Sequence, residues 1–125
     1  MIKVLTPKNK KKPNRISVKI PKKLDSELST HIEKNCLSKK ARSKWISEAI
    51  EELSTSETYW LLVQEDWIER GNNVTIQVSF DKPHESLLTR MIVEVQKNLD
   101  EETDDLKSSI VRTAIIGKLM KEESL

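Results

Sequence analysis

Hydrophobic and polar residues alternate strictly in two short stretches of the chain, RISVKIP and VTIQVSF. The apolar positions of these stretches are Ile16, Val18 and Ile20 in the first, and Val74, Ile76, Val78 and Phe80 in the second. A period of two places successive side chains on opposite faces of an extended chain. The pattern therefore predicts two β-strands, over 15–20 and 74–80, with Pro21 closing the first.

Elsewhere the apolar residues recur every three or four positions, which predicts amphipathic helices. We expect helices over about 24–35, from the N-cap Ser43 to Leu53, over 57–70, from near Pro83 to Leu99, and around 108–119. Their candidate buried residues are Leu24, Leu28, Ile32 and Cys36; Ile46, Ala49, Ile50 and Leu53; Trp60, Val63 and Trp67; Leu88, Met91, Ile92, Val95 and Leu99; and Val111, Ala114, Ile115 and Leu119. We interpret Trp45, Trp60 and Trp67 as core or interface residues, with base stacking as the alternative.

The strand and the helices that follow it occur twice. A shift of 60 residues places Ile16 on Ile76, and a shift of 65 places Ser43 on Ser108. The difference of five residues falls in the connection between the two helices of each copy, where insertions are tolerated. Each copy supplies one strand, so the two strands must pair into an antiparallel ribbon whose apolar face packs on the helices. The expected parts are a basic arm (1–14), a first repeat (15–54), a connecting helix and turn (55–73), a second repeat (74–120) and a short tail (121–125).

The charge of the chain is distributed unevenly. Residues 1–24 hold nine of the 22 Lys and Arg residues and no acidic residue, whereas the net charge of the whole chain is only +2. A tract with two prolines and no apolar periodicity predicts a mobile arm that binds a polyanion, and a solubilising tail is the alternative. The cations of this arm are Lys8, Lys10, Lys11 and Lys12.

Other chemistry has little support in the sequence. The chain has a lone cysteine, Cys36, and lacks both an apolar run near the ~20 residues that span a bilayer and an apolar signal core. His31, Cys36 and His84 do not have a metal-ligand spacing, and the two glycines make no phosphate-binding loop. The sequence does not indicate a catalytic nucleophile together with a general base that would activate it. We therefore expect a cytoplasmic protein that is not an enzyme and needs no cofactor.

The two copies resemble the ribbon-helix-helix DNA-binding superfamily, of the MetJ, Arc and CopG type. RISVKIP and SKWISEAIEEL carry the resemblance best, and TIQVSF with SSIVRTAIIGKL is looser. Members usually build the ribbon from two identical chains. This chain therefore resembles a fused, tandem form, mostly helical with one two-stranded ribbon, similar in layout to TraY-type relaxosome proteins and VirC2-type proteins.

The resemblance implies that the ribbon enters the major groove of DNA and that its outward residues contact base edges. The groove is about 12 Å wide and admits a two-stranded ribbon. The candidate base-contacting residues are Arg15, Ser17, Lys19, Thr75, Gln77 and Ser79. An ordinary solvated hairpin face is the alternative, because polar alternation is common.

The family also places the start of the second helix of each copy on phosphates, for which free helical N–H groups are suited. The candidate phosphate-contacting residues are Lys39, Lys40, Arg42, Ser43, Lys44, Lys107, Ser108 and Ser109. The acidic stretch at 100–105 precedes the second set and departs from the pattern. We expect this loop to point away from DNA, and weak backbone contact by the second copy is the alternative.

We therefore expect a sequence-specific double-stranded DNA-binding protein of a prokaryotic cytoplasm, associated with the nucleoid or a plasmid. It would act as a transcriptional repressor or as an accessory factor at an origin of transfer. Expected partners are double-stranded DNA, further copies on adjacent sites and a relaxase or other DNA-processing protein, but no membrane. The unequal strands predict a non-palindromic site. The alternative is a protein-interaction module, such as an antitoxin or assembly factor, in which the ribbon is only structural.

Overall fold

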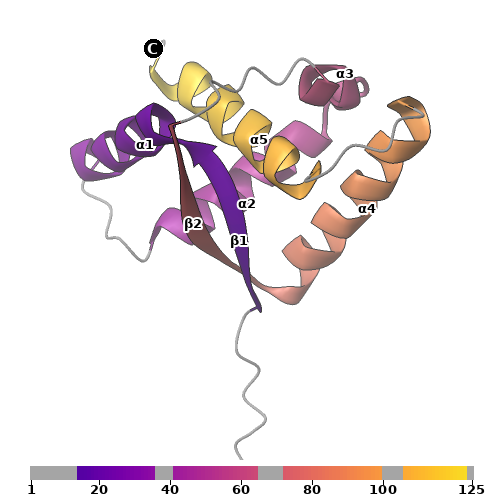
Figure 1. The fold of residues 1–125 in the computed structure, drawn as a ribbon, viewed down its shortest axis with the longest axis horizontal. Helices are drawn as coiled ribbons and strands as arrows, with labels where there is room; N and C mark the ends of the chain where they lie inside the picture. The colour runs from indigo at the N-terminus through magenta and orange to yellow at the C-terminus, as the bar shows by residue number, and fades with distance from the viewer. Residues whose placement is uncertain (1–13, 36–40, 65–71, 100–105, 124–125) are drawn as a thin grey trace, which may run out of the picture.

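The computed structural model describes residues 14–35, 41–64, 72–99 and 106–123. This part of the chain is mostly helical, with one two-stranded antiparallel sheet (Figure 1). The prediction is confirmed at that level. The elements follow one another as β1 (Asn14–Pro21), α1 (Lys22–Lys34), α2 (Ala41–Ser54), α3 (Tyr59–Gln64), β2 (Asn73–Phe80), α4 (Lys82–Leu99) and α5 (Leu106–Glu123).

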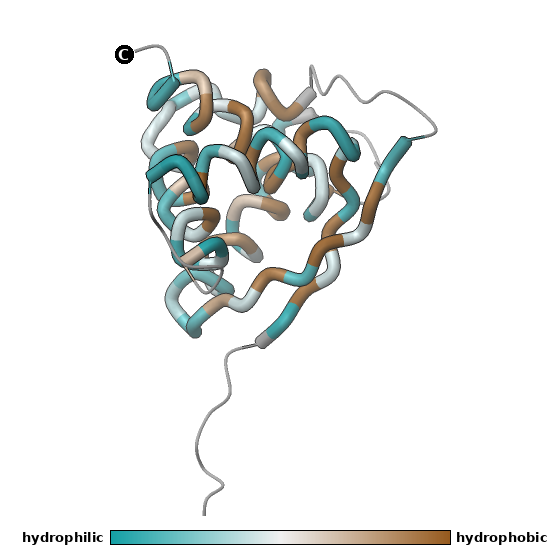
Figure 2. Tube along the Cα trace, turned by 90° about the vertical axis from the view of Figure 1, so that its left-hand side faces the viewer, coloured by the Kyte–Doolittle hydropathy of each residue, from teal (hydrophilic) through white to brown (hydrophobic). Residues whose placement is uncertain are grey.

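The two strands form the ribbon with Ser17 opposite Gln77 at its middle. Toward one end Lys19 lies opposite Thr75, and toward the other Arg15 lies opposite Ser79. Hydrophobic and polar positions alternate along both strands in Figure 2, where the ribbon lies against one side of the helices. The apolar positions turn toward the helices, as the period of two predicted. The buried ones are Val18, Ile20, Ile76, Val78 and Phe80, and the half-buried ones are Ile16 and Val74.

Beneath the ribbon α2 and α5 pack against each other, with α2 under β2 and α5 under β1, while α1 and α4 flank them (Figure 1). Each large apolar side chain that is fully buried contributes roughly 1.5–3 kcal/mol to folding. The fully buried ones in the helices are Leu28, Ile46, Ile50, Met91, Val95, Ile110, Val111 and Ile115. Trp45 is also buried, which confirms the prediction that it is a core residue.

Helix starts follow local chemistry at α4 but not at α2. The carboxylate of Asp81 caps α4 by accepting a hydrogen bond from the backbone N–H of His84 at 3.1 Å, and Pro83 suits the first turn. The prediction of Ser43 as the N-cap of α2 was wrong, because α2 begins at Ala41 and Ser43 lies within its first turn. The Ser43 hydroxyl accepts a hydrogen bond from the backbone N–H of Ser79 instead.

The helix expected over 57–70 is described only as α3, since residues 65–71, including Trp67, lie outside the described part of the chain. Within α3 the buried side chains are Tyr59 and Val63, whereas Trp60 is half-buried. The hydroxyl of Tyr59 donates a hydrogen bond to the carboxylate of Glu94 in α4. Burial and this bond both raise the pKa of Tyr59, so α3 is attached to α4 by a neutral phenol.

Candidate nucleic-acid interface

The outer face of the ribbon gathers all six residues predicted to contact bases. They form three facing pairs, Arg15 with Ser79, Ser17 with Gln77 and Lys19 with Thr75, in which Ser79 is half-buried and the others are exposed. Neither strand contains an Asp or Glu, and each end of this face carries one cation. We call this surface the reading face. It offers hydrogen-bonding groups of both kinds together with positive charge.

At the centre of the reading face, Nε2 of Gln77 donates a hydrogen bond to Oγ of Ser17 at 2.8 Å. The two side chains therefore hold each other across the strands. Directly opposed residues on one face of an antiparallel pair lie close enough for such contacts. Both residues are exposed, so the remaining hydrogen-bonding capacity of the Gln77 amide and of the Ser17 hydroxyl is open to other partners.

The first turns of α2 and α5 are bonded to opposite edges of the ribbon. Oγ of Ser108 in α5 accepts a hydrogen bond from the backbone N–H of Lys19 at 3.1 Å. Oγ of Ser43 in α2 accepts one from the backbone N–H of Ser79 at 3.0 Å. Each ribbon edge therefore has one of its backbone donors satisfied by a helix start, and these helix starts flank the reading face.

The residues predicted to contact phosphates occupy different environments. Lys44 is exposed and Lys107 is half-buried, both in the first turns that flank the ribbon. The guanidinium of Arg42 forms an ion pair with Asp25 of α1. Ser108 and Ser109 are buried, and the Ser108 hydroxyl accepts from the ribbon; that this helix start contacts phosphates stays a prediction. Outside the described residues lie Lys39, Lys40, the arm cations Lys8, Lys10, Lys11 and Lys12, and the acidic stretch 100–105.

Sequence reasoning missed Arg112, which lies in α5 beneath the Lys19 end of the ribbon and is 4% exposed. Its Nη1 donates to the carbonyl oxygen of Lys19 at 2.6 Å, and its Nη2 donates to Oγ of Ser109 at 3.0 Å. Arg112 follows Ser108 by four positions and precedes Ile115 by three, so it shares a helix face with buried residues. That spacing is the one signal in the sequence from which its burial could have been inferred.

His84 joins the start of α4 to α2 beside the Ser79 end of the ribbon. Its Nε2 lies 2.6 Å from Oε1 of Glu51, and its Nδ1 is hydrogen-bonded to the carboxylate of Asp81. Burial favours the neutral imidazole, but the bonds to the two carboxylates outweigh it and raise the pKa of His84. The bond from His84 in turn lowers the pKa of Asp81.

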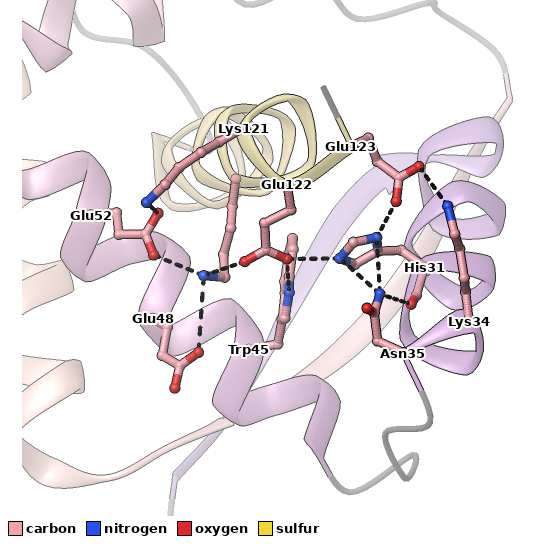
Figure 3. A network of polar contacts seen from close by, with 10 residues as sticks. His31, Lys34, Asn35, Trp45, Glu48, Glu52, Lys121, Glu122 and Glu123 are labelled. Atoms are coloured by element: carbon pink, nitrogen blue, oxygen red, sulfur yellow. Dashed lines mark hydrogen bonds and ion pairs between the residues drawn. The ribbon is translucent and has the colours of Figure 1, made fainter. Parts of the chain in front are cut away.

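A network of charged side chains joins the end of α5 to α1 and α2, on the helices away from the reading face (Figure 3). The buried Nζ of Lys118 lies 2.8 Å from Oε2 of Glu52 and 2.9 Å from Oε2 of Glu122. Oε1 of Glu122 accepts a hydrogen bond from Nε1 of Trp45 and lies 2.7 Å from Nε2 of His31. Burial raises the pKa of Glu122, but the bonds from Lys118, His31 and Trp45 outweigh it and lower the pKa to about 2. The network satisfies buried charge between three helices and is therefore structural.

Comparison of the chain with protein-family models, with curated proteins and with solved structures finds no match. Among the residues that the structure describes, no group of three or more His, Cys, Asp and Glu side chains is arranged to hold a metal ion. In the described ranges no helix is both long enough and apolar enough to cross a membrane.

Proposed function

We propose that this chain is a sequence-specific double-stranded DNA-binding protein that inserts its ribbon into the major groove. The observation that carries the proposal is the reading face, which has two cations, neutral hydrogen-bonding groups and no carboxylate. Arg side chains pair with guanine and Gln side chains with adenine in that groove. Its biological role is repression of transcription or assistance at an origin of transfer.

We propose in addition that the chain is a tandem ribbon-helix-helix protein whose two copies are related by an approximate two-fold axis. Ser17 lies opposite Gln77, the residue 60 positions further on, as two equivalent residues beside such an axis would. The N–H of Lys19 bonds to Ser108, while the N–H of Ser79, 60 positions after Lys19, bonds to Ser43, 65 positions before Ser108. This exchange of equivalent contacts supports the repeat.

The two helix starts beside the ribbon would contact the phosphates on either side of the groove. Free N–H groups and the local dipole favour anions at a helix start, and Lys44 and Lys107 add positive charge there. Such contacts fix the position of a protein on DNA without reading its sequence. Base preference would then depend on the reading face alone.

The proposal is tested by selecting bound fragments from random duplex DNA and measuring affinity at several salt concentrations. We expect a defined sequence and affinity that falls steeply with salt, because lysine and arginine displace counterions from phosphates. Lys19→Ala or Arg15→Ala should remove preference at one or two base pairs, each worth roughly 1–3 kcal/mol. Removing residues 1–12 should weaken binding to all sequences alike.

Lys97→Ala is the matched control, because Lys97 is an exposed cation near the end of α4. It removes the same charge as Lys19→Ala and should leave the base preference unchanged. Binding that prefers no sequence, or a preference that neither Arg15→Ala nor Lys19→Ala alters, would contradict the proposal. Affinity that does not change with salt would instead favour a protein partner.

A further inference from the structure

The backbone of Lys19 is held by α5 at both of its polar groups. Its N–H donates to Oγ of Ser108 at 3.1 Å, and its carbonyl oxygen accepts from Nη1 of Arg112 at 2.6 Å. Arg112 is itself fixed, because it is buried and its Nη2 donates to Oγ of Ser109 at 3.0 Å. Hydrogen bonds from a charged donor are about twice as strong as those between neutral groups. We call this arrangement the arginine clamp.

The opposite end of the ribbon has no arginine in the corresponding place. The N–H of Ser79 donates to Ser43 at 3.0 Å, as that of Lys19 does to Ser108. However, the residue of α2 that lies 65 positions before Arg112 is Ser47, whose side chain ends at a short hydroxyl. An open pocket of about 450 Å3 lies beside Ser79 at this end, and it is lined by Lys44, Ser47, Glu48, Glu51, Asp81 and His84.

We propose that Arg112 is a positioning residue that makes the Lys19 and Thr75 end of the reading face the stringent half of the DNA site. The Arg15 and Ser79 end is the permissive half. This inference rests on the proposed function and deepens it. It divides the site into two halves that differ in how strongly they reject a wrong base.

The physical reason lies in how closely a base-reading side chain must be placed. Discrimination between bases requires donors and acceptors held to within about 0.5 Å of the productive geometry. At Lys19 the clamp fixes the backbone on both sides of the residue, so only side-chain torsions remain to adjust. At Ser79 the backbone is bonded to α2 through its N–H and borders a pocket, so it is freer to shift and accept another base pair.

The test measures relative affinities for every single base-pair change in the selected site. Lys19→Ala and Arg15→Ala first identify the base pairs beneath each end. We expect Arg112→Lys, which keeps the charge but lacks the guanidinium fork, to lower discrimination at the Lys19 end from roughly tenfold to twofold or less. Discrimination at the Arg15 end should change by less than about twofold.

Ser108→Ala and Ser43→Ala form a matched pair of milder variants, which serve if Arg112→Lys does not fold. Each removes one hydroxyl that accepts from a ribbon N–H, at opposite ends of the reading face. We expect Ser108→Ala to reduce discrimination at the Lys19 end, and Ser43→Ala to cause a smaller loss at the other end. A residue that only stabilises the fold would change affinity for all sequences by one factor and leave their ratios intact.

Three results would overturn the inference. They are equal loss of discrimination in both halves, loss confined to the Arg15 end after Arg112→Lys, and a uniform loss of affinity with unchanged ratios. Failure of the unaltered protein to prefer any sequence would instead overturn the proposed function. The two failures are therefore distinguishable in one set of measurements.

Discussion

Single residues fix the ribbon in two ways, through apolar side chains beneath it and through hydrogen bonds at its edges. Ile20 and Val78 are fully buried against the helices. The edge donors of Lys19 and Ser79 are bonded to hydroxyls of α5 and α2. Burial gives most of the stabilisation, and the edge bonds determine where the helix starts lie beside the reading face.

Ile20→Ala should lower the free energy of unfolding by about 2–5 kcal/mol, because it leaves a cavity beneath β1 in a position that solvent does not reach. Urea denaturation measures the change. Val93→Ala is the control, since Val93 is 58% exposed and its truncation should change stability by less than about 0.5 kcal/mol. Equal effects of the two variants would show that the ribbon is not packed on the helices as described.

The sequence predicted most of the apolar residues of the core but missed Tyr59, Leu106 and Ile110 and its buried cations. Val18 and Ile20 follow from alternation within one strand, which is a local pattern. Arg112 and Lys118 bond to Lys19 and Glu52, which lie 93 and 66 positions away along the chain. Local periodicity treats a cation as solvent-exposed. Only the packing of α5 between the ribbon and other helices brings these partners within reach.

At the scale of elements, α4 is attached to α2 through His84 and its two carboxylates, Asp81 and Glu51. A carboxylate only accepts hydrogen bonds, so both ring nitrogens donate when the imidazole is protonated. The link between the two helices is therefore strongest for the charged form of His84. Because the link weakens when His84 loses its proton, the packing of α4 on α2 is sensitive to pH. The link lies beside the Ser79 end of the ribbon.

The pH dependence of stability tests this link. The pKa of His84 is raised above its ordinary value of 6.5 in the folded protein, so the folded state holds the proton more tightly than the unfolded state. Its contribution is complete below about pH 6 and is lost as the pH rises through the folded pKa. We expect the free energy of unfolding to fall above pH 6.5, and His84→Gln to remove that part of the decline.

Lys82→Gln is the control for His84→Gln, because Lys82 is an exposed residue in the same turn of α4. It should leave the pH profile unchanged. Profiles of the His84→Gln variant and the unaltered protein that run parallel between pH 6 and 8 would show that protonation of His84 does not strengthen the link.

Element types were easier to predict than element boundaries. Both strands and the four longer helices lie where the periodicity predicted, within a few residues. Serine is a common N-cap residue, but the hydroxyl of Ser43 accepts a hydrogen bond from the backbone N–H of Ser79 in the ribbon. Helix α2 begins at Ala41, two residues before Ser43. A tertiary partner therefore takes the hydroxyl that an N-cap would use. Tyr59 was missed because burial beside Glu94 depends on α4, which lies far along the chain.

At the scale of the whole molecule, both strands of the ribbon belong to one chain. The pairing of Ser17 with Gln77 is intramolecular, so the reading face forms at any protein concentration. Its two strands also differ in sequence, with Arg, Ser and Lys on β1 facing Ser, Gln and Thr on β2. Under the proposed function, two identical strands would favour a palindrome, whereas these unequal strands would favour an asymmetric DNA element.

The measurement that tests the central claim most directly is a footprint of the chain on its selected duplex, with methylation of guanine N7 as the probe of the major groove. We predict that one chain protects a short, non-palindromic element and blocks N7 of its guanines, because the proposed function places the ribbon in that groove. Protection by a single chain over a perfect inverted repeat, or bound DNA whose N7 atoms stay reactive throughout, would contradict the account.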